Sequence, residues 1–136
     1  MLTLDVLIST IYSAGIHRVA AMNLPVMEGV RYVVSWQCPE GKIPAELCRS
    51  DIKIIPFDKR GLSSNRNNAL ANSTADLCLI ADDDLIYKAD QLQKVIDSFE
   101  QHPEVEVACF CYKGDHKRYP IELTDISKRL PKGYSV

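Results

Sequence analysis

The sequence predicts an α/β protein with a mostly parallel sheet of about five strands flanked by helices. Two observations predict this fold class. Segments rich in branched aliphatic residues alternate with segments of helical periodicity, and no internal repeat interrupts the alternation. The chain has 136 residues, a hydrophobic fraction of 46% and a formal net charge of −2, all ordinary for one soluble globular domain.

The expected elements alternate in chain order, which implies right-handed crossovers between parallel strands. Two of the expected helices are followed directly by a proline, Pro25 and Pro103, and this supports the predicted helix ends. We expect strands at residues 4–10, 30–36, 52–57, 75–81 and 105–112. We expect helices at 16–24, at 44–49, from Ser63 or Ser64 to about 73, and at 89–102.

Composition excludes several classes of protein. The near-neutral charge argues against a nucleic acid partner. The five cysteines include no CxxC pair, so we expect neither a disulfide framework nor a zinc site. Cys78, Cys109 and Cys111 lie in apolar runs and are expected in the core, which suits a reducing, cytoplasmic location. No apolar stretch reaches the ~18 residues of a membrane span, and no signal peptide is expected.

Three adjacent carboxylates, Asp82, Asp83 and Asp84, follow an apolar run of the kind that is buried on both faces of a sheet. Side chains at i and i+2 of a strand share a side, so Asp82 and Asp84 should converge while Asp83 faces away. Ligands of open α/β sheets bind at the carboxyl ends of the strands. The triplet therefore predicts a divalent-metal site for a phosphorylated ligand, with an acidic helix N-cap as the alternative.

A turn dense in hydrogen-bond donors, residues 59–68, precedes the triplet by one crossover. A helix that begins near Ser63 would present its amides and dipole to an anion. Arg66, in its first turn, suits either bidentate contact with phosphate or a salt bridge to a carboxylate at the sheet end. An arginine, exposed amides and a metal carboxylate at one sheet edge suit a diphosphate.

Together these two segments resemble the nucleotide-binding half of a family 2 glycosyltransferase with the GT-A fold. Residues 61–67 keep the order of a glycine, small residues and an Ala-Arg-Asn-like trio, with Asn65 in place of the alanine. Residues 82–84 match the family's Asp-x-Asp motif, and residues 86–92 resemble its Ile-Tyr-x-Pro-Asp-x-Leu segment. The first strand is similar to the family's opening strand, with Ser9 for the usual proline. The resemblance covers roughly residues 4–112.

The resemblance implies a role for each matching residue. Asp84, assisted by Asp82, would ligate Mg2+ or Mn2+, while Asp82 and Asp83 would also belong to the nucleotide-sugar site. Arg66 would contact the base or the diphosphate, and Thr10 would offer backbone contacts to the base.

The second strand departs from the family, because Trp36 and Gln37 stand near its usual aspartates. Gln37 is expected to hydrogen-bond a base. Trp36 is expected either to stack on a base or to lie in the core or a lid.

The resemblance implies a metal-dependent, inverting transfer of a sugar from a nucleoside-diphosphate sugar, with a UDP-sugar favoured. The acceptor would be a carbohydrate or a lipid-linked hydroxyl, and peripheral membrane association is compatible with this. The alternatives are a non-catalytic nucleotide or nucleotide-sugar binding module and an aspartate-dependent phosphotransfer domain.

The expected domains are a nucleotide-sugar-binding domain at 1–112 and, at 113–136, the start of an acceptor-side region. The late carboxylates Asp115, Glu122 and Asp125 match no motif of a catalytic base. We therefore expect the base to lie outside this chain and the chain to be the N-terminal portion of a longer enzyme.

Overall fold

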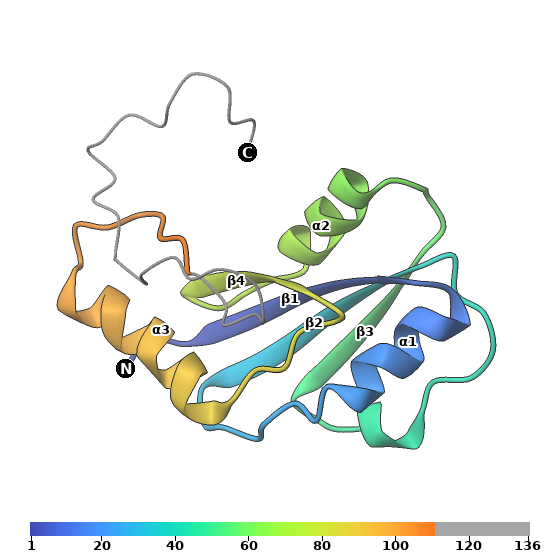
Figure 1. Cartoon of the computed structure of the whole chain (residues 1–136). Coiled ribbons are helices and arrows are strands. Elements are labelled where there is room, and N and C mark those ends of the chain that lie inside the picture. Colours follow the sequence, from blue (N-terminus) through green and yellow to red (C-terminus); the bar gives the residue numbers. More distant parts are fainter. Residues whose placement is uncertain (111–136) are drawn as a thin grey trace, which may run out of the picture. The chain divides into compact units, whose positions relative to one another are not determined.

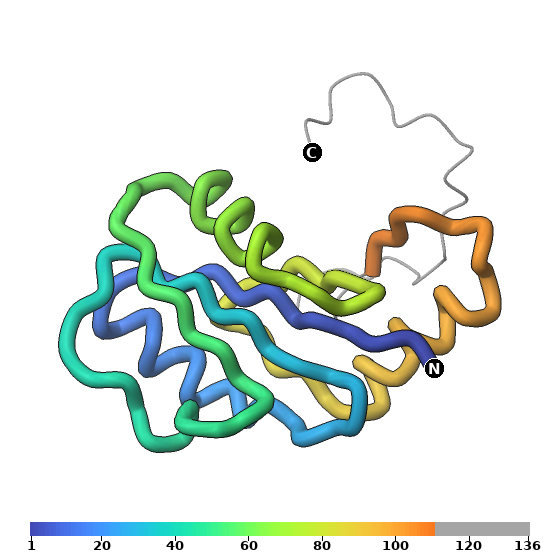
Figure 2. The backbone as a smooth tube through the Cα atoms, turned by 180° about the vertical axis from the view of Figure 1, so that it is seen from behind, coloured from blue at the N-terminus to red at the C-terminus, as the bar shows by residue number. Residues whose placement is uncertain are grey.

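Parallel strands in the order β3-β2-β1-β4 form the sheet of the computed structural model, which describes residues 1–110 (Figure 1). All pairings are parallel, with Leu4 opposite both Val30 and Leu77. Seen from behind, β1 runs between β2 and β4 (Figure 2). The strands are β1 Leu4–Ile11, β2 Val30–Gln37, β3 Ile52–Phe57 and β4 Leu77–Asp82.

Helices lie on both faces of this sheet, and almost every residue of β1 and β2 is buried, whichever face it points to. Figure 1 shows α2 on one side of the sheet and α1 on the other. The face toward α2 carries Leu7 and Val33, which pack with Ala69 of that helix. The helices are α1 Tyr12–Ala21, the short 3-10 helix η1 Ala45–Leu47, α2 Leu62–Ala71 and α3 Ala89–Gln101.

The opposite face of the sheet holds the larger part of the core. Alternate residues of β1 and β2 on this face are fully buried, as strand periodicity requires. The amphipathic periodicity of the helices supplies the facing side chains from α1 and α3. The buried residues are Leu4, Val6, Ile8, Val30, Tyr32, Val34, Ile16, Val19, Leu92, Val95 and Ile96.

The chain divides into two units, residues 1–97 and 98–136. Every strand of the described residues belongs to the first unit. In the second unit α3 ends at Gln101, and a turn closed by the Val105 amide and the His102 carbonyl follows, with an N–O distance of 3.0 Å. No helix of residues 1–110 is both long and apolar enough to cross a membrane.

The α/β class with a parallel sheet is confirmed, whereas the strand count is not. Residues 105–110 of the expected fifth strand have no strand structure, and residues 111–112 lie outside the described residues. The apolar composition of this segment suits a strand, but a strand forms only where a partner edge is available.

The expectation that β4 is buried on both faces is also wrong. Ile80 is 58% exposed and Cys78 is exposed, while Ala81 on the other face is buried. The reason is that α2 packs on β1, β2 and β3, which leaves the corresponding face of β4 open among the described residues. Cys109 is exposed as well, and Cys111 lies outside the described residues.

Candidate functional site

A polar cavity of about 460 Å³ lies at the carboxyl edge of the sheet, where β1, β2 and β4 end. The turn before α2 and one arginine of α1 complete it. Parallel strands place their carboxyl ends at one edge, which is where open α/β sheets bind ligands. Its lining residues are Ser9, Thr10, Ile11, Arg18, Gln37, Arg60, Gly61, Leu62, Asn65, Asp82, Asp83 and Asp84.

The acidic triplet lines this cavity, but not in the predicted arrangement. Asp83 was expected to face away, yet its carboxylate accepts hydrogen bonds from Thr10 Oγ1 at 2.7 Å and Arg18 Nη2 at 2.8 Å. The strand ends at Asp82, and Asp83 and Asp84 lie in a turn, so the alternation of a strand no longer applies. Asp82 pairs with Arg66, with 3.2 Å between Oδ1 and Nη2.

Two arginines therefore neutralise part of the acidic edge. The hydrogen bond to Asp83, then the charge of that carboxylate, raises the pKa of Arg18, and the charge of Asp84 adds to the effect. Arg60 also lines the cavity. The site thus presents cations and carboxylates together, as a site for a metal-bound diphosphate requires.

Residues 1–110 contain no cluster of three His, Cys, Asp or Glu side chains that would enclose a metal ion. Mg2+ is usually bound through one or two carboxylates together with waters and substrate phosphates, rather than by an all-protein cage. Asp82 and Asp84, both at the cavity, therefore fit a hard divalent ion that shares its ligands with a phosphorylated substrate.

The N-terminus of α2 opens onto the cavity, because both Gly61 and Leu62 line it. The helix begins at Leu62, just before the expected start at Ser63 or Ser64, with Gly61 as its N-cap and without a side-chain cap. Gly61 has a φ of 116°, which other residues adopt only with strain. The first amides of a helix have no intrahelical partner and suit an anion.

The structure brings Thr10 and Gln37 to the cavity and places Arg66 beside it through Asp82. It does not bring Trp36 there. Trp36 lies on the α1 face of β2, is 3% exposed and donates its indole N–H to the Tyr12 carbonyl at 2.9 Å. Of the two roles left open for Trp36, the structure favours the core.

Sequence reasoning missed four polar side chains of the cavity as members of the site: Ser9, Arg18, Arg60 and Asn65. Arg60 and Asn65 lie in the donor-rich turn that the sequence singled out, so their position carried a signal. Ser9 adjoins Thr10 at the end of an expected strand. Nothing in the sequence around Arg18 pointed to the site, because Arg18 reaches it from α1, a helix on the other face of the sheet.

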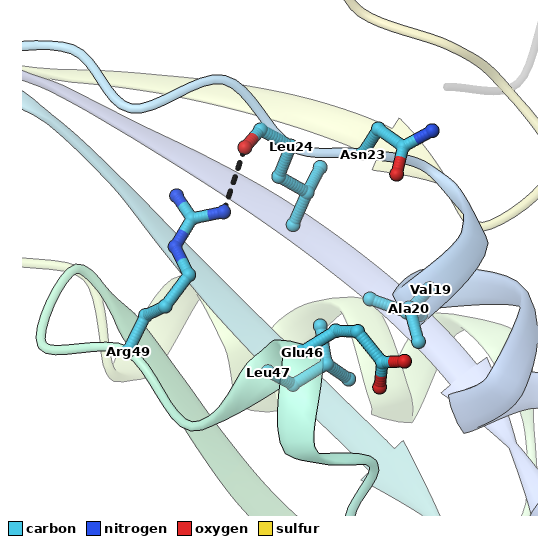
Figure 3. A pocket seen from close by; sticks show the side chains of 7 residues that line it. All are labelled: Val19, Ala20, Asn23, Leu24, Glu46, Leu47 and Arg49. Carbon is cyan, nitrogen blue, oxygen red and sulfur yellow. Dashed lines mark hydrogen bonds between the residues drawn. The ribbon is translucent and has the colours of Figure 1, made fainter.

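A smaller cavity of about 250 Å³ lies between the end of α1 and η1 (Figure 3). Arg49 bridges it by donating to the Leu24 carbonyl at 2.7 Å, and the same side chain forms an ion pair with Asp51. These contacts tie the connections before β2 and β3 together. We regard this cavity as structural.

The fold and the site define a Rossmann-like α/β protein with a charged cavity at the carboxyl edge of its sheet. A model of the family described as glycosyl transferase family 2 matches residues 42–135. The chain belongs to this family, and its fold is consistent with GT-A. The comparisons with curated proteins and with solved structures found no match.

Proposed function

We propose that the chain binds a nucleoside-diphosphate sugar, with a UDP-sugar favoured, and serves a metal-dependent, inverting transfer of its sugar. The observation that carries this proposal is the convergence of Asp82, Asp83 and Asp84 with Arg18 and Arg60 in one cavity. Family membership supports a glycosyltransferase in general. The acceptor would be a carbohydrate or lipid-linked hydroxyl.

We propose a role for each charged residue that lines the cavity. Asp84, with Asp82, would hold Mg2+ or Mn2+, and Asp82 would otherwise bind the ribose. Arg18 and Arg60 would contact phosphate oxygens, since a guanidinium suits bidentate phosphate binding. Asp83 would keep Arg18 oriented through their 2.8 Å ion pair.

In the proposed reaction an acceptor hydroxyl gives its proton to a general base and attacks the anomeric carbon in line as the nucleoside diphosphate leaves, which inverts that carbon. The metal, when bound, would act as a Lewis acid on the leaving diphosphate. The arginines would stabilise the same negative charge by preorganised hydrogen bonds. We assign no general base among residues 1–110, so a non-catalytic donor-binding module is the alternative. We also propose a cytoplasmic location, which suits a chain whose five cysteines include no CxxC pair.

Thermal unfolding with UDP tests the proposal. UDP should raise the melting temperature in Mn2+ and not in EDTA, because a ligand that binds the native state stabilises it by mass action. Asp84→Asn should remove the metal-dependent shift and leave the melting temperature of the free protein unchanged. Glu28→Gln, an exposed carboxylate in the turn before β2, is the matched control and should keep the full shift.

Equal shifts in Mn2+ and EDTA would contradict metal-bridged binding. Unfolding of the Asp84→Asn variant would instead show that the acidic turn is structural.

A further inference from the structure

Strands β1 and β4 are joined at both ends by the same pair of side chains, a threonine and an aspartate. At the amino end Thr3 Oγ1 donates to Asp76 Oδ2 at 2.7 Å, and at the carboxyl end Thr10 Oγ1 donates to Asp83 Oδ2 at 2.7 Å. The partners are 73 positions apart in both pairs, which is the offset that also aligns the two strands in the ladder. Each aspartate therefore lies one step beyond β4 and still keeps the register of β4 with β1.

The pair at the carboxyl end holds a residue that the strand itself no longer holds. Asp83 lies in the turn after β4, and its side chain is 14% exposed. Its carboxylate accepts one hydrogen bond from Thr10, which is 3% exposed, and another from Arg18 of α1 at 2.8 Å. Gly15 of α1 packs against the same Thr10 hydroxyl and leaves no room there for a Cβ atom. The hydroxyl is thus fixed between α1 and the acidic turn.

The three carboxylates of this turn differ in how far their charge is compensated. Asp82 pairs with Arg66 at 3.2 Å, and Asp83 has the two donors described above. Asp84 lines the cavity but has neither a hydrogen bond nor an ion pair with any residue that the structure describes. Adjacent carboxylates repel one another unless donors or a cation neutralise them. The donors on Asp82 and Asp83 therefore leave Asp84 as the carboxylate that a cation would neutralise.

We propose that Thr10 is a positioning residue for the metal: its hydroxyl holds Asp83 in register with β1 and thereby fixes the place of Asp84 in the cavity. This inference rests on the proposed function, in which Asp84 is a metal ligand. Groups that hold a metal ligand in place typically change metal affinity by about tenfold to a hundredfold when they are lost. Thr10 holds the residue next to the ligand, so its effect should be smaller.

Titration calorimetry with UDP at a series of Mn2+ concentrations tests this role. Thr10→Val keeps the shape of the side chain and all backbone groups but removes the hydroxyl. The Mn2+ concentration that gives half-maximal UDP binding should then rise about threefold to tenfold. Thr10→Ser keeps the donor and should stay within about twofold of the wild type. Circular dichroism sets a temperature at which each free variant is folded, so that a loss of stability alone does not change the Mn2+ requirement.

The chain offers a matched control at the other end of the same strands. Thr3→Val removes a threonine–aspartate hydrogen bond of the same length, far along β1 from the cavity. Both valine variants should lower the melting temperature of the free protein, since each loses a hydrogen bond to a charged group. Only Thr10→Val should raise the Mn2+ requirement.

The outcomes separate this inference from the proposed function. An unchanged Mn2+ requirement in Thr10→Val, or an equal rise in Thr3→Val, would overturn the positioning role and leave metal-dependent donor binding standing. A Thr10→Val protein that does not fold would show that the hydroxyl serves the fold, and would overturn the positioning role as well. Absence of metal-dependent UDP binding in the wild type would overturn both.

Discussion

At the scale of single residues, Gly15 determines how closely α1 approaches β1. A Cβ atom at Gly15 would lie 2.2 Å from Thr10 Oγ1, the hydroxyl that donates to Asp83. Glycine usually weakens a helix interior by about 0.5–1 kcal/mol relative to alanine. The short distance between Gly15 and Thr10 explains why a glycine stands in this buried turn of α1. It also links the helix to the acidic edge, because Thr10 binds Asp83.

We therefore expect Gly15→Ala to destabilise the protein by about 1–3 kcal/mol, as overpacking usually does. In a Thr10→Ala background the cost should fall by at least half, because the nearest remaining atom is the Cβ of residue 10 at 3.4 Å. Urea unfolding of the four proteins of this double-mutant cycle measures the difference. An equal cost in both backgrounds would show that the contact with Thr10 is not the cause.

Asp5 is a buried carboxylate at the opposite end of β1, with no exposed surface. It accepts hydrogen bonds from the Thr74 amide at 2.9 Å, the Ala75 amide at 3.1 Å and Ser73 Oγ at 2.8 Å, and it pairs with Arg31. Burial raises the pKa of Asp5, but these hydrogen bonds and the charge of Arg31 outweigh it, so the pKa is lowered. The carboxylate thereby fastens the turn before β4 to β1.

A lowered pKa in the folded state stabilises the protein above the unfolded-state value near 4, and this stabilisation is lost as pH falls through the folded-state value. Asp5→Asn should thus cost about 2 kcal/mol at pH 7, the typical worth of hydrogen bonds to a charged group. The difference from the wild type should shrink as pH falls below about 4. Urea unfolding from pH 7 to pH 3 tests this, and a constant difference would refute it.

The charged residues were the part of the site that could be recognised from the sequence. The acidic triplet and the donor-rich turn were found because adjacent carboxylates and a Gly-Arg turn are unusual at strand ends. Ser9 and Asn65 were not found, because a hydroxyl or amide becomes informative only when its burial and missing partner are known. Asp83 was misplaced because a strand's alternation cannot predict where the strand ends.

At the scale of elements, the order of strands and helices was predictable from periodicity, and the junctions were not. We expected α1 to begin at Ile16, but β1 runs directly into a helix that begins at Tyr12. Tyr12 makes this junction with a φ of 59°, a conformation that bulky residues rarely adopt. No propensity scale predicts a tyrosine there, since the surrounding structure imposes the strain.

The same substitution on the two faces of the sheet tests how much each face contributes to stability through packing. Ile8 in β1 has no exposed surface, whereas Ile80 in β4 is 58% exposed. Ile8→Ala should destabilise the protein by about 2–5 kcal/mol through lost burial and a cavity. Ile80→Ala should cost about 0.5 kcal/mol or less, as exposed substitutions do.

Denaturant unfolding of both variants measures these costs on the same scale. A large cost at Ile80 would mean that further parts of the chain cover this face of β4 in solution.

At the scale of the whole molecule, the sheet and the cavity of the described residues lie in the first part of the chain. Every strand of the described residues ends by Asp82, and the last residue that lines the cavity is Asp84. The family match, in contrast, extends from residue 42 to 135. The division into domains at residues 112 and 113 stays a prediction, because the described residues end at 110.

Donor binding should therefore be separable from the last quarter of the chain. We expect residues 1–101, which keep α3 intact, to fold and to bind UDP with Mn2+ within about twofold of the affinity of the full chain, because every proposed contact is retained. The melting temperature should change by less than about 4 °C, the shift that ~1 kcal/mol produces in a domain of this size. Any sugar transfer by the full chain should be lost, since acceptor orientation needs residues beyond the donor cavity. Calorimetry, thermal unfolding and a transfer assay on both proteins test the three parts. A large loss of stability or of UDP affinity would show instead that residues 102–136 complete the sheet or the cavity.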